Sequence, residues 1–154
     1  MTADQQNEKD IQYMRLAIEQ ANLSIPVPTA YCVGAIIVKD SRVLSSGYSR
    51  ELPGNTHAEE CALLKLSLNS TTLIPNGAAI YTTMEPCSTR LSGKRSCVDQ
   101  ILEAGIMRVV IGVEEPDHFV KCVGVDLLRE KGVEVVRVKG LEEECLKPNR
   151  HVLG

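Results

Sequence analysis

The stretch AAIYTTMEPC, residues 78–87, is the part of the sequence that indicates the fold class. Its first six residues are apolar, aromatic or β-branched, which favours a buried strand, and the stretch ends at a Glu-Pro-Cys tripeptide. A polar segment over residues 84–96 follows, and apolar residues then recur at helical intervals from Val98. A strand that leads through a loop into a helix is the repeating unit of an α/β fold.

Two more strand-like runs precede this unit. Residues 32–38 are nearly all apolar, and residues 42–48 follow after a turn, so we expect the two runs to pair as a hairpin. The other expected elements are a helix over 10–21, a helix from His57, a strand over 108–113, a helix over 123–130, a strand over 133–138 and one helical turn after 141.

This order of elements predicts an α/β fold, a three-layer α/β/α sandwich around a five-stranded mixed sheet. The later crossovers are expected to be parallel. Because 154 residues is the usual length of one domain, we expect a single domain over residues 1–154, with its core at about 10–140.

The composition restricts the class of protein. With 44% hydrophobic and 24% charged residues, and no apolar run near the roughly 20 residues of a membrane span, the sequence is typical of a globular protein outside the membrane. The polar N-terminus lacks the apolar stretch of a secretory signal, so a cytoplasmic location with reduced cysteines is expected. A net charge of −3, a single Phe and the absence of Trp disfavour nucleic acid as a partner.

Three side chains near expected helix starts can hold a metal ion. His57 follows a Pro-Gly-Asn-Thr loop, Cys87 follows the strand at 78–83, and Cys97 begins the next helix. One imidazole and two thiolates leave the fourth position of a tetrahedral Zn²⁺ to water, which is typical of a catalytic site. Glu59, two residues after His57, is expected to shuttle a proton from that water to a leaving amine.

Other interpretations of these residues stay open. A structural zinc site needs a fourth protein ligand, for which His118, Cys61 and Cys122 are the candidates. The alternative from another class of protein is a noncatalytic binding module in which zinc only stabilises the fold. The residues can also be a chance combination of a surface histidine and two buried thiols.

The run His57-Ala58-Glu59 and the later Pro86-Cys87 and Cys97 resemble the H-x-E and P-C-x-x-C signature of the cytidine deaminase-like superfamily. The nine residues 88–96 replace the usual two between the cysteines. This insert, with the runs EPCSTRLSG and GNTHAEEC, resembles the pyrimidine deaminases of riboflavin biosynthesis, and the fungal members in particular.

The resemblance implies a substrate and its contacts. It implies a phosphorylated small molecule, 2,5-diamino-6-(ribitylamino)pyrimidin-4-one 5′-phosphate, which is deaminated with Zn²⁺ as the cofactor. Asn55 resembles the residue that contacts the sugar in this superfamily. The insert supplies basic and hydroxyl candidates for contact with the phosphate, namely Arg90, Lys94, Arg95 and Ser88.

Two expectations depend on the superfamily alone. Its members commonly form oligomers, so we expect a homodimer. A nucleoside, a nucleobase or a tRNA adenosine is the alternative substrate, although the low aromatic content disfavours tRNA.

Overall fold

The computed structural model describes residues 1–69, 75–116 and 122–153. At its centre lies a five-stranded sheet with the order β2-β1-β3-β4-β5. The strands are β1 (Gly34–Lys39), β2 (Arg42–Tyr48), β3 (Ala79–Met84), β4 (Arg108–Val113) and β5 (Glu134–Arg137). β1 is antiparallel to β2 and to β3, whereas β3, β4 and β5 are parallel. The expected hairpin and mixed sheet are therefore confirmed.

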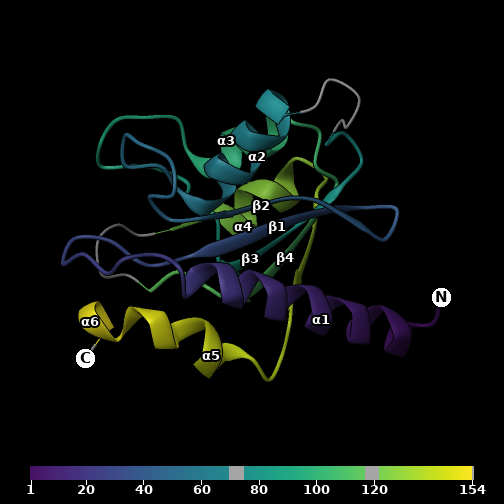
Figure 1. Ribbon diagram of the computed structural model, residues 1–154. Helices are drawn as coiled ribbons and strands as arrows, with labels where there is room; N and C mark the ends of the chain where they lie inside the picture. Colours follow the sequence, from purple (N-terminus) through teal and green to yellow (C-terminus); the bar gives the residue numbers. More distant parts are fainter. Residues whose placement is uncertain (70–74, 117–121, 154) are drawn as a thin grey trace.

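Helices cover both faces of the sheet (Figure 1). One face carries α1 (Ala3–Ala21), α5 (Glu142–Leu146), the 3-10 helix η1 (Lys147–Asn149) and α6 (Arg150–Leu153), and the other carries α2 (Ala58–Asn69), α3 (Cys97–Glu103) and α4 (Gly124–Glu130). Adjacent residues of β1 show the alternation, because Ile36 packs in the cluster that contains Met14 of α1, and Ile37 packs in the cluster that contains Ala62 of α2. The three-layer α/β/α sandwich is confirmed.

Both ends of the chain hold more helix than the sequence predicts. α1 begins at Ala3 rather than near residue 10, because Thr2 and Gln5 form a capping box in which each side chain accepts the other's backbone N–H, at 3.1 and 2.8 Å. At the C-terminus, α5, η1 and α6 replace the single expected turn, and both Cys145 and Asn149 are fully buried. Across the described residues, no helix is long and apolar enough to cross a membrane.

A glycine brings α2 close to the sheet. Gly47 of β2 lies against the first turn of α2, and a Cβ at this position would collide with the carbonyl oxygen of Ala58. Because Gly47 has no side chain, the beginning of α2 rests directly on β2. This contact positions His57 and Glu59, which flank Ala58.

Candidate active site

Three side chains from separate segments converge at the starts of α2 and α3. His57 directly precedes α2, Cys87 lies three residues after the end of β3, and Cys97 is the first residue of α3. The Nδ1 atom of His57 lies 3.5 Å from the sulfur of Cys87 and 3.4 Å from the sulfur of Cys97. All three ligand atoms lie within 4.8 Å of one another. The structure thus brings together the three residues that the sequence predicts as metal ligands.

Backbone hydrogen bonds hold the two cysteines in place. Ser96 is the N-cap of α3, and its hydroxyl accepts a hydrogen bond from the amide of Asp99 at 3.1 Å. The amide of Cys97 donates to the sulfur of Cys87 at 3.2 Å, and the amide of Val98 donates to the carbonyl of Cys87 at 3.2 Å. The first turn of α3 therefore fixes both sulfurs.

Hydrogen bonds and charge interactions link the protonation of these three groups. The hydrogen bond from the Cys97 thiol lowers the pKa of Cys87 to about 5, although burial opposes this shift. The same hydrogen bond, together with burial, raises the pKa of Cys97 well above its ordinary value. Burial lowers the pKa of His57, but its hydrogen bond and charge interaction with Cys87 raise it by more. An imidazole and two sulfurs at these distances form a donor set that Zn²⁺ favours.

Within residues 1–69, 75–116 and 122–153, no fourth protein ligand joins the cluster. The sulfur of Cys61 donates to the hydroxyl of Thr56 at 3.1 Å, and the sulfur of Cys122 donates to the carbonyl of Pro86 at 3.2 Å. His118, the remaining candidate for a structural site, lies outside the described residues. The described residues therefore fit a zinc site with one open position, as in catalytic sites.

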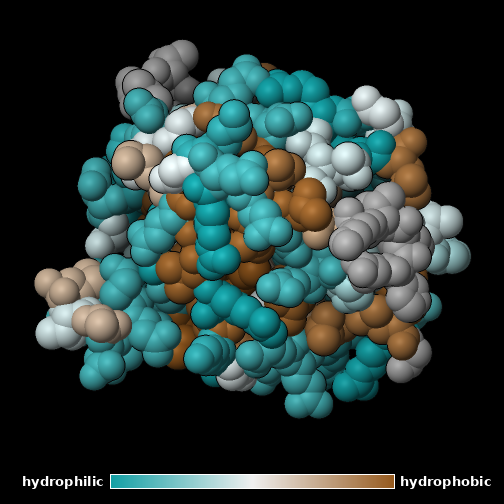
Figure 2. Space-filling model, turned by 180° about the vertical axis from the view of Figure 1, so that it is seen from behind, coloured by the Kyte–Doolittle hydropathy of each residue, from teal (hydrophilic) through white to brown (hydrophobic). Residues whose placement is uncertain are grey.

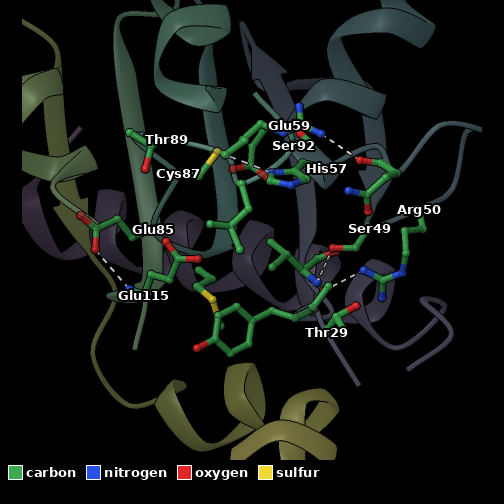
Figure 3. A pocket seen from close by; sticks show the side chains of 17 residues that line it. Thr29, Ser49, Arg50, His57, Glu59, Glu85, Cys87, Thr89, Ser92 and Glu115 are labelled. Carbon is green, nitrogen blue, oxygen red and sulfur yellow. Dashed lines mark hydrogen bonds between the residues drawn. The ribbon is translucent and has the colours of Figure 1, made fainter. Parts of the chain in front are cut away.

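Glu59 is buried beside the three ligands. Its side chain lies next to His57 and Cys87 in the cavity (Figure 3), and the residue is only 3% exposed. Burial, followed by the negative charge of Cys87, raises the pKa of Glu59 to about 7. A carboxyl group with a pKa near neutrality can accept and return a proton, as a general acid–base requires.

A cavity opens in front of these groups (Figure 3). Its empty volume of about 810 Å³, part of which is open to solvent, falls in the range of small-molecule sites. Residues from segments 29–33, 49–59, 84–87 and 89–92 line it, together with Glu115. The cavity therefore gives a small ligand access to the cluster and to Glu59.

The comparison with protein families agrees with this geometry. Residues 7–113 match the family described as the cytidine and deoxycytidylate deaminase zinc-binding region. The chain belongs to this deaminase family. Zinc is the cofactor of the family, and His57, Cys87 and Cys97 are positioned to bind it.

Curated relatives of this deaminase include proteins of riboflavin biosynthesis. The diaminohydroxyphosphoribosylamino-pyrimidine deaminase of Schizosaccharomyces pombe is 49% identical over 136 residues, which cover 88% of this chain and 34% of that protein. A deaminase of the same name from Buchnera aphidicola is 32% identical over 146 residues, which cover 92% of each chain. The riboflavin biosynthesis protein RibD of Aquifex aeolicus is 36% identical. The chain spans only 34% and 38% of the S. pombe and Aquifex proteins.

Solved structures also resemble this deaminase. The crystal structure of the Aspergillus oryzae Rib2 deaminase superimposes with a TM-score of 0.82 at 34% identity, over 90% of this chain and 89% of that one. The dCMP deaminase of the cyanophage S-TIM5 superimposes with a TM-score of 0.67 at 26% identity, over 89% of this chain and 99% of that one. Both likenesses agree with the fold described above.

Two of the expected substrate contacts of the deaminase line the cavity, Asn55 and Arg90. The side chain of Arg90 is only 2% exposed, and its guanidinium pairs with Glu60 at 3.1 Å and donates to the carbonyl of Asn55 at 2.8 Å. Asn55 has a φ of 57°, in the left-handed region that Asn tolerates better than most residues. Arg90 thus holds the backbone of Asn55, and Glu60 is part of the site's framework.

The other expected contacts are not among the described residues that line the cavity. The hydroxyl of Ser88 accepts a hydrogen bond at 3.2 Å from a backbone amide next to α4. The Nζ atom of Lys94 donates to the carbonyl of Gly54, and Arg95 pairs with Glu103 on the surface. The assignment of Ser88, Lys94 and Arg95 to the substrate stays a prediction.

Glu85 supports the backbone of the deaminase site. One of its carboxylate oxygens accepts a hydrogen bond from the amide of Glu115 at 3.1 Å, and the other accepts one from the amide of Val125 at 2.9 Å. A single side chain after β3 therefore joins the end of β4 to the start of α4.

Arg50 and Glu115 also line the cavity, and neither is predicted as a site residue from the sequence. Because β1 is antiparallel to both β2 and β3, β2 runs in the same direction as β3 and β4, and their C-terminal ends meet at one edge of the sheet. Arg50 lies two residues after β2, and Glu115 lies two residues after β4. Charged residues just after parallel strands were the signal that could have found them.

Proposed function

We propose that this chain hydrolyses 2,5-diamino-6-(ribitylamino)pyrimidin-4-one 5′-phosphate to 5-amino-6-(ribitylamino)pyrimidine-2,4-dione 5′-phosphate and ammonia. The observation that carries the proposal is the convergence of His57, Cys87 and Cys97 within 4.8 Å of one another, beside the buried Glu59. The names of the S. pombe and Buchnera relatives support the choice of substrate. A solved structure of the A. oryzae Rib2 deaminase in complex with DARIPP supports it as well.

Glu59 is the catalytic residue in this proposal. His57, Cys87 and Cys97 would hold a zinc ion, and this ion would supply a Lewis acid that makes water easier to deprotonate near neutral pH. Glu59 accepts a proton from the attacking water while the water oxygen forms a bond to C2 of the pyrimidine. The bond from C2 to its amino nitrogen then breaks, and Glu59 passes the proton to that nitrogen, which leaves as ammonia. The hydroxyl left on C2 tautomerises to the carbonyl of the product.

Asn55 contacts the polyol chain of the substrate in this proposal. Its place in the lining of the cavity and the bond from Arg90 to its backbone support this role. Ser88, Lys94 and Arg95 stay candidates for the phosphate, because residues 89–92 of the same insert reach the cavity.

Ammonia release from a panel of substrates tests the proposal. The zinc-loaded protein is expected to deaminate the ribitylaminopyrimidine phosphate with a much higher kcat/KM than cytidine, dCMP, cytosine or a tRNA adenosine. The dCMP arm is included because a dCMP deaminase shares the fold at 26% identity. A preference for any other member of the panel contradicts the substrate, and no release from any member favours a noncatalytic zinc module.

A variant of Glu59 tests the proton transfer. Glu59→Gln is expected to keep its zinc and to lower kcat by about 100-fold or more, because general acid–base catalysis contributes roughly 10²–10⁴-fold. Glu130→Gln, an exposed change on α4, is the matched control and is expected to keep wild-type turnover. Unchanged turnover in zinc-loaded Glu59→Gln would exclude Glu59 as the proton shuttle.

We also propose that residues 1–154 form one deaminase domain that works as a cytoplasmic homodimer. Large apolar side chains are exposed in the described part of the chain, among them Leu64, Leu68 and Met107. Figure 2 shows apolar residues exposed between hydrophilic ones on the side opposite to the view of Figure 1. Light scattering is expected to give twice the chain mass of 16.9 kDa, and a monomer mass contradicts the dimer. Cell fractionation tests the location.

A further inference from the structure

Arg50 lines the cavity from an unusual backbone conformation. Its φ is 62°, in the left-handed region that residues with a long side chain seldom adopt. The amide of Arg50 donates to the carbonyl of Thr56 at 2.7 Å, which ties this turn to the residue before His57. A residue keeps a strained backbone conformation only where the surrounding structure holds it in place. Such residues are frequent at functional sites. The side chain of Arg50 is therefore a candidate for contact with a ligand.

Neutral groups hold the guanidinium of Arg50 in place. It donates hydrogen bonds of 3.0 to 3.2 Å to the hydroxyl of Ser24 and to the carbonyls of Ile25 and Tyr31, and a longer one of 3.6 Å to the sulfur of Cys32. Among the residues that the structure describes, no carboxylate pairs with it. Its five N–H groups also exceed these four acceptors. The positive charge is thus fixed in position, and in the part of the chain that the structure describes it has no carboxylate as counter-ion.

The other cations of the site differ from Arg50. Arg90 lines the cavity as well, but its charge is compensated by Glu60 at 3.1 Å. Lys94 and Arg95 are not among the described lining residues, and Arg95 already pairs with Glu103. In the described lining, Arg50 is therefore the cation whose charge remains available to an anion.

Carboxyl groups occupy the opposite side of the cavity. Figure 3 shows Glu115 and Arg50 on opposite sides, with His57 and Glu59 between them in this view. Burial raises the pKa of Glu115 to about 7, and the labelled residues on that side are carboxyl groups rather than cations, so the described lining there offers an anion no positive charge. The charge distribution directs the anionic end of a ligand towards Arg50.

We infer that Arg50 binds the phosphate group of the substrate, an inference that rests on the proposed function. The pyrimidine ring then lies at the metal ligands, and the ribityl chain runs from there to Arg50. Guanidinium groups are well suited to this role, because they present several N–H donors to phosphate oxygens and stay charged. The bonds to Ser24, Ile25 and Tyr31 hold the donors in place before the substrate arrives.

Kinetics with a pair of substrates test Arg50. Arg50→Gln is expected to raise KM for the phosphorylated pyrimidine by about 10- to 100-fold, because hydrogen bonds to charged groups are worth that much in affinity. KM for the dephosphorylated pyrimidine is expected to change less than about 3-fold. Arg50→Lys, which keeps the charge, is expected to fall between Arg50→Gln and the wild type. An equal rise in KM for both substrates overturns the inference.

Further variants separate phosphate binding from support of the fold. Ser24→Ala removes a hydrogen-bond partner of Arg50 but keeps its charge, so KM for the phosphorylated pyrimidine is expected to rise less than in Arg50→Gln. Arg15→Gln, on the exposed side of α1, is expected to leave the preference for the phosphorylated substrate unchanged. If Lys94→Ala or Arg95→Ala loses that preference while Arg50→Gln keeps it, the phosphate belongs to the insert and the inference is overturned.

Inorganic phosphate provides a test that does not require turnover. In the zinc-loaded wild type, phosphate is expected to raise Tm and to shift the Nε–H resonance of Arg50. The rise in Tm is expected to be lost in Arg50→Gln and kept in Arg15→Gln, an exposed change on α1. An unmoved Arg50 resonance at saturating phosphate overturns the inference even if the variant does not fold. If no pyrimidine is deaminated but this response is present, the proposed substrate fails while the anion site stands.

Discussion

The guanidinium of Arg90 donates a hydrogen bond of 2.8 Å to the backbone carbonyl of Asn55, 35 residues away in the sequence. The same guanidinium pairs with Glu60, whose carboxylate accepts a hydrogen bond from the amide of His57 at 3.1 Å. The insert between the cysteines is therefore connected to the segment that carries the histidine ligand. The buried side chain of Arg90 thus joins the insert between Cys87 and Cys97 to the segment of His57.

Removal of Arg90 is expected to destabilise the protein. Arg90→Ala leaves Glu60 and the carbonyl of Asn55 without their partner, and such a loss at a buried pair costs roughly 3 kcal/mol. Arg95→Ala removes an exposed pair with Glu103 and is the control. Its free energy of unfolding is expected to change by less than about 0.5 kcal/mol. Urea unfolding of the zinc-loaded proteins measures the free energy of unfolding of both variants. Equal stabilities for the two variants would mean that the Arg90 contacts add nothing to the fold.

Loss of a ligand is expected to remove the metal. Cys97→Ser replaces a thiolate donor at the start of α3, and we expect zinc affinity to fall by more than about 100-fold, beyond the effect typical of outer-shell changes. Cys61→Ala is the control, because Cys61 is also buried but lies outside the cluster. This variant is expected to keep one zinc per chain. Metal analysis after dialysis gives the result. A chelator is expected to lower Tm of the wild type and of Cys61→Ala, but not of Cys97→Ser.

The buried ion pair of Asp10 predicts a loss of stability in acid. Burial raises the pKa of Asp10, but the hydrogen bonds from Arg108, Tyr81 and Gln6 lower it by more, to below its ordinary value of 3.8. Because the folded state holds the carboxylate in its charged form, this stabilisation is complete above pH 3.8 and is lost as the pH falls through the lowered pKa. Arg108 binds both carboxylate oxygens, at 2.8 and 2.7 Å.

Asp10→Asn is the variant that tests this pair. We expect it to lower the free energy of unfolding by roughly 3 kcal/mol near pH 7, because the charge of Arg108 loses its buried carboxylate partner. The difference from the wild type is expected to shrink as the pH falls below about 4. Asp40→Asn, in an exposed turn with a φ of 52° that Asn also adopts, is the control. Urea unfolding at several pH values measures the difference, and a gap that stays constant down to pH 2 would contradict the assignment.

Asn149 is expected to support the wall of the cavity from the C-terminus. Its side chain accepts a hydrogen bond from the amide of Cys32 at 2.5 Å and donates to the carbonyl of Cys32 at 3.1 Å. Asn149→Ala leaves both backbone groups buried and unpaired, and we expect this to lower the free energy of unfolding by about 2–4 kcal/mol. Faster hydrogen exchange at the amide of Cys32 is the measurement. Asn22→Ala, at the exposed end of α1, is expected to leave that exchange rate unchanged.

The sequence predicts the sheet and the metal ligands because their signals are local. The hairpin at residues 32–48 is visible as two apolar runs around a turn, and His57 and Cys97 stand at helix starts. The early start of α1 was missed although its signal is local too, since Thr2 and Gln5 have capping-box spacing.

The remaining features depend on contacts between distant segments, which local patterns do not contain. Arg90 belongs to a charged run, and such runs are usually solvated, yet its partner Glu60 buries it. Arg50 stands in a loop without a recognisable motif, and it reaches the cavity only because β2 runs in the same direction as β3 and β4. The burial of Asn149 likewise follows from its pairing with Cys32, 117 residues earlier.

Glu85 accepts hydrogen bonds from the amides of Glu115 and Val125 with its two carboxylate oxygens, so the length of one side chain sets the spacing between the end of β4 and the start of α4. Glu85→Asp, which is shorter by one methylene group, can satisfy both amides only if these two ends move. A change of one methylene group is therefore a direct way to alter the shape of the cavity at Glu115.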